Sequence, residues 1–181
     1  MTIQYAMVID TKTCIGCGDC VVACKTENKT PVGLNRDWVV EATRGKWPNL
    51  TTEFRSERCN HCSNATCVTM CPTGASHYWG DTNIVLVEAH KCTGCKACIA
   101  ACPYDARLIM HPEGYIDKCT FCHHRVEKGQ DPACVSSCPT ECMHFGILND
   151  PGSKVSQLLK TRNYKALMIE TGNEPNVYYL T

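Results

Sequence analysis

The chain has 181 residues, 17 cysteines and a formal net charge of zero, from 18 basic and 18 acidic side chains. The balanced charge, without a basic run, argues against nucleic-acid binding, and no apolar run is long enough to span a bilayer. Large apolar residues are scarce, with three Phe and three Trp. We therefore expect bound metal to complete the core, and the apo-protein to be largely unfolded.

Cysteine spacing decides between disulfides, zinc and iron–sulfur clusters. Disulfide scaffolds are typical of short secreted chains with even cysteine counts, but this count is odd and the cysteines are bunched. Structural zinc sites use pairs of C-x2-C units. The run from Cys92 to Pro103 instead reads C-x2-C-x2-C-x3-C-P, the bacterial ferredoxin pattern for a [4Fe–4S] cluster. The spacing therefore favours iron–sulfur clusters, with a zinc-stabilised binding module as an alternative.

The N-terminal segment predicts a strand that leads into the first motif. Residues 1–10 lack the charged start of a secretory signal peptide. Motif one follows as Cys14, Cys17, Cys20 and Cys24, with the spacing of the run at Cys92. Gly16 and Gly18 ease the tight loop that this motif needs.

A polar insertion, residues 25–58, separates motif one from motif two. It contains an expected strand at 38–42, and Trp38 and Trp47 either pack locally or cover a cluster or a partner. Motif two comprises Cys59, Cys62, Cys67 and Cys71, a C-x2-C-x4-C-x3-C-P variant. Because this set is complete, we expect His61 to be a hydrogen-bonding neighbour of the cluster and not a ligand.

Motifs three and four follow a predicted hairpin at 77–91. Motif three comprises Cys92, Cys95, Cys98 and Cys102, and motif four comprises Cys119, Cys122, Cys134 and Cys138. The four motifs leave one cysteine of the 17, Cys142. It is either a spare thiol in a small-residue position or a replacement for a neighbouring ligand. The basic insertion 121–133, preceded by Lys118, is either a solvated loop that balances cluster charge or a docking surface.

The tail after residue 146 contains no cysteine. It predicts a helix at 154–160, capped by Asp150 or Ser153, and two strands at 166–170 and 177–180. A tail of this kind wraps its own domain or a partner.

The motifs indicate electron transfer and not catalysis. Each has four cysteines, whereas a cluster that performs substrate chemistry normally leaves one iron open. The sequence has no Ser-His-Asp set, no P-loop and no glycine-rich dinucleotide fingerprint. Four clusters in one small protein suit a relay between two distant redox sites.

The order of the motifs, with a long gap after the first and an insertion within the fourth, resembles a known family. These are the four-cluster, ferredoxin-like electron-transfer subunits (beta subunits) of molybdopterin oxidoreductases of the dimethyl sulfoxide, polysulfide, thiosulfate and arsenate reductase type. The similar stretches are 7–10, 23–28, 59–62, 71–75, 102–104, 118–122 and 175–180. One departure is the run from Cys138 to Cys142, which reads C-P-T-E-C where the family has C-P-T-G-A.

The resemblance implies an α+β fold of two nested ferredoxin-like modules of the βαββαβ type, with long loop insertions. Module one would comprise 1–24 and 119–146 and carry motifs one and four; module two would comprise 59–118 and carry motifs two and three. Residues 25–58 would be an insertion, and 147–181 a C-terminal tail. Spacing alone leaves a sequential pairing of the motifs equally open.

Four [4Fe–4S] clusters are implied, because every motif retains its cysteines. By the family pattern the fourth cysteine of each motif binds the neighbouring cluster. The implied ligand sets are set one, Cys14, Cys17, Cys20 and Cys138; set two, Cys119, Cys122, Cys134 and Cys24; set three, Cys59, Cys62, Cys67 and Cys102; and set four, Cys92, Cys95, Cys98 and Cys71.

Two partners are also implied by the resemblance. The motif-one cluster would face a molybdopterin (Mo or W) catalytic subunit, and the motif-three cluster would face a membrane-integral quinone-reactive subunit. Anaerobic respiration of a sulfur or arsenic compound is favoured, because the motif-one stretch looks most like the arsenate and polysulfide branches. The chain would be peripheral on the membrane, on the periplasmic face after co-export with the catalytic subunit, or else cytoplasmic. The alternatives are a subunit of another redox complex and a free polyferredoxin.

Overall fold

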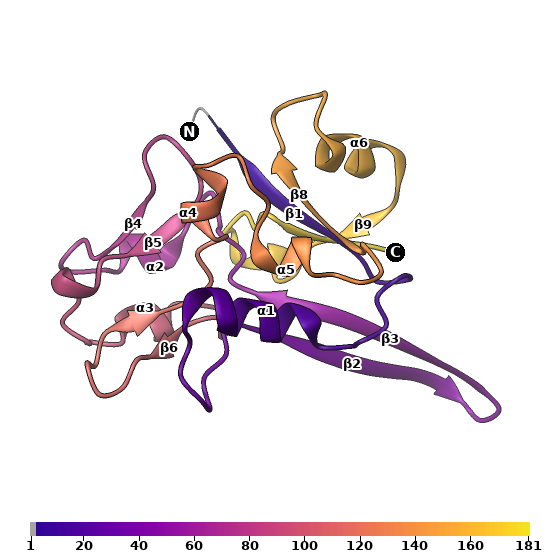
Figure 1. Ribbon diagram of the computed structural model, residues 1–181, viewed down its shortest axis with the longest axis horizontal. Helices are drawn as coiled ribbons and strands as arrows, with labels where there is room; N and C mark the ends of the chain where they lie inside the picture. Colours follow the sequence, from indigo (N-terminus) through magenta and orange to yellow (C-terminus); the bar gives the residue numbers. More distant parts are fainter. Residues whose placement is uncertain (1–2) are drawn as a thin grey trace.

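The computed structural model describes residues 3–181, and Met1 and Thr2, which begin the predicted first strand and first module, lie outside them. A four-stranded sheet of order β8-β1-β10-β9 organises the molecule (Figure 1). Its strands are β1 (Tyr5–Asp10), β8 (Met143–Ile147), β9 (Tyr164–Lys165) and β10 (Val177–Leu180). β1 pairs antiparallel with β8 and parallel with β10. The predicted N-terminal and C-terminal strands are confirmed, and the tail wraps its own domain.

Strand β1 is buried on both faces because its residues alternate between two apolar clusters. Met7 and Ile9 face the main core, whereas Val8 faces a second cluster with Val155 and Leu180. This alternation follows from the two-residue period of a strand. The second cluster lies beneath helix α6 (Lys154–Thr161), which packs on β8 and β1. The predicted helix is confirmed, as is its cap: the Ser153 hydroxyl accepts a hydrogen bond from the Ser156 amide at 3.2 Å.

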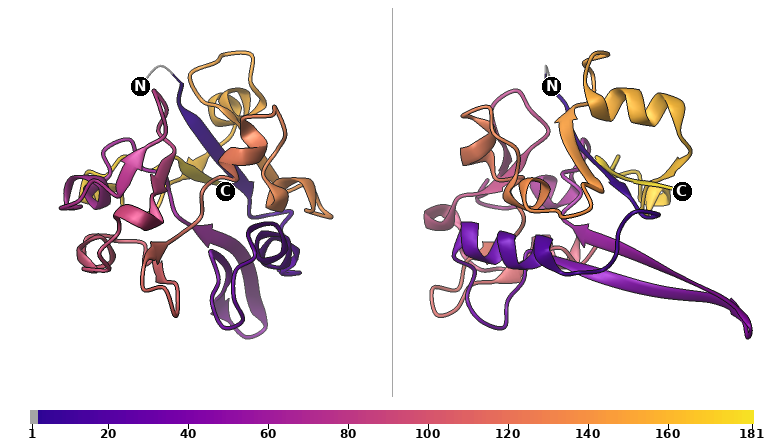
Figure 2. Two further views of the ribbon diagram at one scale, coloured as in Figure 1. Left: turned by 60° about the vertical axis from the view of Figure 1, so that its left-hand side comes forward. Right: turned by 45° about the vertical axis from the view of Figure 1, so that its right-hand side comes forward.

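The insertion after motif one forms a long two-stranded ribbon. Strands β2 (Asp37–Lys46) and β3 (Asn49–Arg58) pair antiparallel along their whole length. Figures 1 and 2 show the ribbon projecting away from the rest of the molecule. Trp38 at its base packs against the main core. Trp47 at its tip is 85% exposed, so the expectation that it packs locally or covers a cluster was wrong.

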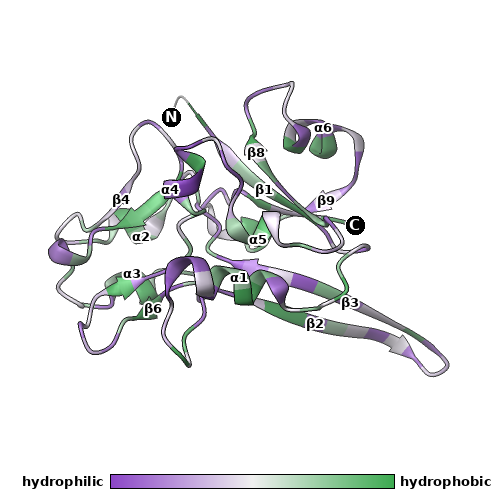
Figure 3. Cartoon of the chain, in the orientation of Figure 1, coloured by the Kyte–Doolittle hydropathy of each residue, from purple (hydrophilic) through white to green (hydrophobic). Residues whose placement is uncertain are grey.

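Short helices and strands surround the cysteine motifs. They are α1 (Asp19–Asn28), α2 (Thr66–Thr69), β4 (Ser76–Tyr78), β5 (Val85–Val87), η1 (Ala89–Lys91), α3 (Ala97–Ala100), β6 (Leu108–Ile109), β7 (Ile116–Asp117), α4 (His123–Val126) and α5 (Ala133–Ser136). In Figure 3, α3 and β6 are coloured mainly as apolar. β4 pairs with β5, which confirms the predicted hairpin. Helix α1 packs on α5, and α2 packs on α3, so motif one lies beside motif four and motif two beside motif three.

The predicted strand at 166–170 was wrong. The chain forms a short strand at β9 and then a 3-10 turn, η2 (Ile169–Thr171). Met168 has a left-handed backbone, with φ of 49°, which interrupts any extended run. The apolar side chain of Ile169 is 67% exposed, so the apolar pattern there does not mark a buried strand.

Sulfur contributes much of the buried interior. Among the described residues, nine of the 26 buried apolar side chains are cysteines. None of the helices within residues 3–181 is long and apolar enough to cross a membrane.

Candidate metal centre

The four C-x2-C loops share one backbone conformation. The residue before the second cysteine has a positive φ in every motif: 70° at Gly16, 43° at His61, 65° at Gly94 and 51° at Phe121. A Cβ atom at Gly94 would lie 2.7 Å from the Gly114 carbonyl oxygen, so that loop also needs the missing side chain. His61 and Phe121 adopt the left-handed region without being glycine, which is uncommon. Such strained positions cluster at functional sites.

The structure brings together the four cysteines of set two. Cys24, Cys119, Cys122 and Cys134 are all buried. Burial raises the pKa of Cys24 to about 12, and the sulfurs of Cys134 and Cys122 add to the effect. Burial also raises the pKa of Cys119, with contributions from Cys24 and Cys134. The Asn28 amide nitrogen lies 3.6 Å from the Cys24 sulfur and 4.0 Å from the Cys122 sulfur, as a donor between two helices.

The four cysteines of set three also lie together. Burial raises the pKa of Cys62 to about 12, and Cys59, Cys67 and Cys102 raise it further. Cys102 belongs to motif three, yet its own pKa is raised by burial and by Cys59 and Cys67 of motif two. A thiol must lose its proton to bind iron, so thiolates crowded together in this way need the positive charge of a metal centre to compensate them.

Sets one and four are more open to solvent. Cys17 in set one and Cys95 in set four are the two exposed cysteines. Cys14 and Cys138 both help to raise the pKa of the buried Cys142 thiol, after burial, so these members of set one are neighbours. In set four, Cys92 contributes to the raised pKa of Cys98, after burial.

Backbone amides point at sulfurs in several of the loops. The Ser76 amide donates to the Cys71 sulfur at 3.4 Å, the Ile116 amide to Cys92 at 3.5 Å, and the Phe121 amide to Cys119 at 3.5 Å. Hydrogen bonds to cysteine sulfur are among the means by which proteins tune iron–sulfur clusters. Within residues 3–181, no three Cys, His, Asp or Glu side chains meet closely enough to hold a single metal ion. A cubane presents four irons, so its cysteines do not have to meet at one point.

The burial of three cationic side chains shows whether this interior fits an anionic cluster. Arg58 and Lys118 are 1% exposed and Arg107 is 6% exposed. Among the described residues, the only ion pair of the three joins Arg58 to Asp37 at 3.5 Å. Burying a cation without a partner is costly. Cysteine thiolates around anionic clusters supply the missing negative charge, so the donor set and its surroundings fit iron–sulfur clusters.

The sequence pattern did not identify Arg58 or Arg107. Lys118 was expected in a solvated loop or on a docking surface, and both alternatives were wrong for this residue, because its ammonium group is buried and donates to the Cys119 carbonyl oxygen at 2.8 Å. The rest of the basic insertion is partly neutralised by Glu27 of α1, which pairs with His124 at 2.7 Å and with Arg125 at 3.0 Å. The sequence did carry one signal for a buried cation, a charged residue within two positions of a cysteine, and it was present at Arg58 and Lys118.

His61 joins the motif-two loop to the motif-four loop. Its imidazole is fully buried and stacks on the Phe121 ring with centroids 3.8 Å apart. Its Nδ1 accepts a hydrogen bond from the Val85 amide at 3.0 Å. Burial, and then the positive charges of Lys118 and Arg107, lower its pKa. The ring therefore contacts both loops, and its Nδ1 acts as a hydrogen-bond acceptor.

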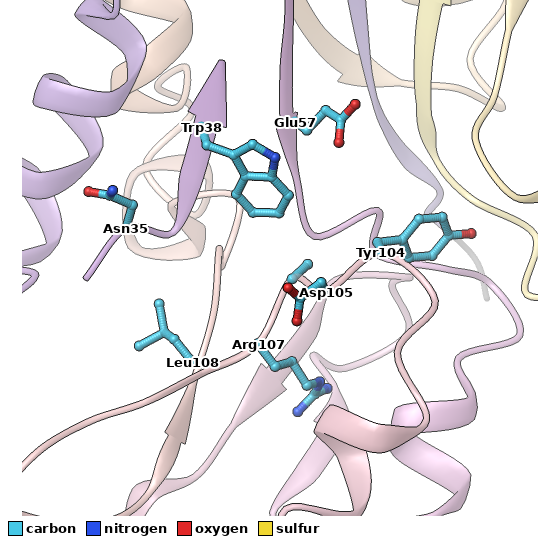
Figure 4. A pocket seen from close by; sticks show the side chains of 8 residues that line it. Asn35, Trp38, Glu57, Tyr104, Asp105, Arg107 and Leu108 are labelled. Atoms are coloured by element: carbon cyan, nitrogen blue, oxygen red, sulfur yellow. The ribbon is translucent and has the colours of Figure 1, made fainter. Parts of the chain in front are cut away.

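A surface cavity of about 450 Å³ lies between the base of the ribbon and the chain after motif three. Its lining includes Trp38, Asp105 and Arg107. Figure 4 shows the Arg107 guanidinium pointing away from the Trp38 indole. The cavity carries no set of side chains arranged for catalysis, whereas the guanidinium beside it is directed at the cysteines.

Cys142 occupies a small-residue position beside set one. It follows the run Cys138-Pro139-Thr140-Glu141, as Ala75 follows the corresponding run in motif two. Glu141 has a positive φ of 51°, close to the 67° of Gly74 at the matching position. The departure from the family run therefore keeps the same turn. Cys142 is 3% exposed, and its sulfur lies 3.4 Å from that of Cys138.

We expect Cys142→Ala to retain every cluster, because set one is complete without it. Iron and acid-labile sulfide per chain should match the unaltered protein. The matched change Cys138→Ala should lower both. Loss of iron in Cys142→Ala would show instead that Cys142 replaces a ligand.

Comparisons with known proteins support bound iron–sulfur clusters. Two family profiles, each described as a 4Fe-4S dicluster domain, match residues 50–148 and 13–75. Two dicluster domains together account for four [4Fe–4S] clusters.

Relatives match over nearly the whole chain. The sequence is 42% identical to a subunit of the tetrathionate reductase of Salmonella typhimurium, over 98% of this chain and 72% of that protein. It is 35% identical to the arsenate respiratory reductase iron-sulfur subunit ArrB of Shewanella sp., over 98% of this chain and 96% of that protein. It is 41% identical to a protein NrfC homolog of Haemophilus influenzae, over 98% of this chain and 80% of that protein. The chain therefore belongs to the four-cluster iron–sulfur subunits of this reductase family, which transfer electrons and are not themselves catalytic.

Proposed function

We propose that the four cysteine sets form one linear electron path, in the order set one, set two, set three and set four. The observation that carries this order is the pattern of exposure. The exposed cysteines, Cys17 and Cys95, belong to sets one and four, whereas all four cysteines of set two are buried. A relay needs accessible ends and a protected interior.

Electrostatic effects of one set on the pKa values of the next support the same order. Cys59 of set three contributes to the raised pKa of Cys119 in set two, after burial and Cys24. Cys67 of set three contributes to that of Cys98 in set four, after burial. The packing of α1 on α5 and of α2 on α3 supports the nested pairing of motifs over a sequential one.

In this arrangement each module follows the ferredoxin scheme. Residues 1–24 and 119–146 hold sets one and two, and residues 59–118 hold sets three and four. When bound, the clusters accept and release single electrons. The chain holds them with cysteine thiolates, buries all four cysteines of set two, and joins the modules through the stack of His61 on Phe121.

The partners follow from the two exposed ends. The end at Cys17 would dock on a molybdopterin catalytic subunit, and the end at Cys95 on a membrane-integral quinone-reactive subunit. Ile15, beside the first end, is 60% exposed and offers apolar surface for such a contact. The named relatives belong to reductases of tetrathionate and arsenate, and we propose a sulfur or arsenic compound as the substrate of the whole complex. We place the chain on the periplasmic face of the membrane, exported together with its catalytic partner.

Purification of the native complex tests this function. After gentle solubilisation of membranes, the chain should elute with a protein that contains molybdenum or tungsten and with a membrane-integral subunit. Protease added to intact spheroplasts should reach it if it lies on the periplasmic face. A free polyferredoxin would instead elute near 20.1 kDa from the soluble fraction. That result would contradict the proposal.

A further inference from the structure

Each proposed module has one buried arginine directed at its cysteines. For module one it is Arg58, the last residue of the insertion, whose Nη1 donates to the Cys134 sulfur at 2.9 Å. Its Nη2 donates to the Ser56 hydroxyl, which is fully buried. Burial lowers the pKa of Arg58, but Cys134 and Asp37, and then Cys119 and Cys20, raise it well above its ordinary value. The guanidinium is thus a permanent cation beside these sulfurs.

Ser56 extends this contact to the other set of the module. Its hydroxyl oxygen lies 3.4 Å from the Cys20 sulfur. Because this oxygen accepts from Arg58, its own proton is available to the Cys20 sulfur. Arg58 therefore reaches set two directly through Cys134, and set one through Ser56.

Arg107 occupies a corresponding place in module two. Its Nη2 donates to the Ser76 hydroxyl at 2.7 Å, and the Ser76 amide donates to the Cys71 sulfur of set four at 3.4 Å. Burial lowers its pKa, but Cys67 and Cys59 of set three and Cys98 of set four raise it. Its Nη1 is buried and makes no hydrogen bond of ordinary geometry to the described residues 3–181.

We propose that Arg58 and Arg107 are positioning residues that raise the reduction potentials of the two clusters between which each lies. The inference rests on the proposed ligand sets. Reduction adds one electron and therefore one negative charge to a cluster, and a fixed cation nearby stabilises the reduced form. Hydrogen bonds to the cysteine sulfurs act in the same direction. The paired arrangement would keep neighbouring clusters close in potential, which favours transfer in either direction.

Asp37 separates an electrostatic role from a purely structural one. It pairs with Arg58 across the first step of the ribbon ladder, at 3.5 Å, and is 1% exposed. Its carboxylate offsets part of the arginine charge. Arg107 has no carboxylate ion-pair partner among the described residues. Removing the Asp37 charge should therefore shift potentials in the direction opposite to removing the Arg58 charge.

The test is a reductive titration of the purified holoprotein with dithionite, followed by electron paramagnetic resonance. Arg58→Gln should lower the reduction equilibrium constants of the module-one clusters tenfold or more, which is about 59 mV for a one-electron couple. The reduction potentials of the module-two clusters should stay unchanged. Asp37→Asn should raise the same two potentials. Arg107→Gln should lower those of module two, and Arg107→Lys should restore them in part. Ser56→Ala should shift set one more than set two.

Measuring iron and sulfide content distinguishes a failure of this inference from a failure of the proposed ligand sets. Each variant is titrated only after its content is shown to match the unaltered protein, and too little iron in the unaltered protein would count against the ligand sets. The arginine inference is overturned if Arg58→Gln and Asp37→Asn shift potentials in the same direction. It is also overturned if loaded variants shift all four clusters equally, or none.

Discussion

Removal of iron from the purified protein should abolish its tertiary structure. Nine of the 26 buried apolar side chains among the described residues are cysteines. Without clusters, their thiols would surround empty space, Arg107 and Lys118 would lose the anions that compensate them, and Arg58 would keep only Asp37. An unpaired buried charge costs several kcal/mol, against a total stability of about 5–15 kcal/mol for a typical domain. The apo-protein should therefore be largely unfolded.

Chelation under reducing conditions, followed by circular dichroism, measures this effect. The near-ultraviolet signal should vanish, and tryptophan emission should shift to longer wavelength. Trp47→Phe removes the exposed fluorophore, so that emission reports Trp38 and Trp79, which pack against the core. Returning iron and sulfide should restore both signals. A cooperative thermal transition in the iron-free protein would contradict the prediction.

Cys102→Ser should remove the cluster of set three and spare that of set four. Cys102 lies in motif three, but the sulfurs that raise its pKa, in addition to burial, are those of Cys59 and Cys67 of motif two. Serine is a much poorer ligand for iron than thiolate, so the loss should be about four irons of about sixteen. Because set three lies inside the proposed path, electron transfer between its ends should fall to background.

Cys71→Ser is the matched control for that experiment. Cys71 lies in motif two but belongs to the implied set four. It should disturb the cluster of motif three and leave that of motif two. Electron paramagnetic resonance of the two variants should therefore show opposite losses. If each variant instead loses the cluster of its own motif, the exchange of fourth cysteines is wrong.

The repeated cysteine spacing made the chemistry predictable from the sequence. A ferredoxin run encodes its own loop, since three sulfurs at fixed intervals face one cluster. The hairpin at β4 and β5, the helix α6 and the strand β10 were also predictable, because local patterns and caps determine them. The length of the ribbon was not, because only its inner end, around Trp38, carries an apolar signal.

The nearness of Arg58 and Lys118 to a cysteine was visible in the sequence, but the burial of the cations was not, for a physical reason. A lysine or arginine normally lies at the surface, and only the charge of a bound group makes its burial favourable. Arg107 becomes buried through contacts with residues far along the chain, such as Ser76. The left-handed backbone at His61 and Phe121 was equally hidden, since their stacking joins segments 60 residues apart. Charge and strain of this kind become predictable only once the clusters are placed.

The position of β1 between β8 and β10 has a consequence for biosynthesis. β1 is made long before its parallel neighbour, which consists of residues Val177–Leu180. The sheet cannot close until residues Val177–Leu180 have left the ribosome. The thiols of the early cysteines therefore remain accessible during translation, and we expect the metal to be loaded after synthesis. Until then these thiols need reducing, oxygen-poor conditions to escape oxidation.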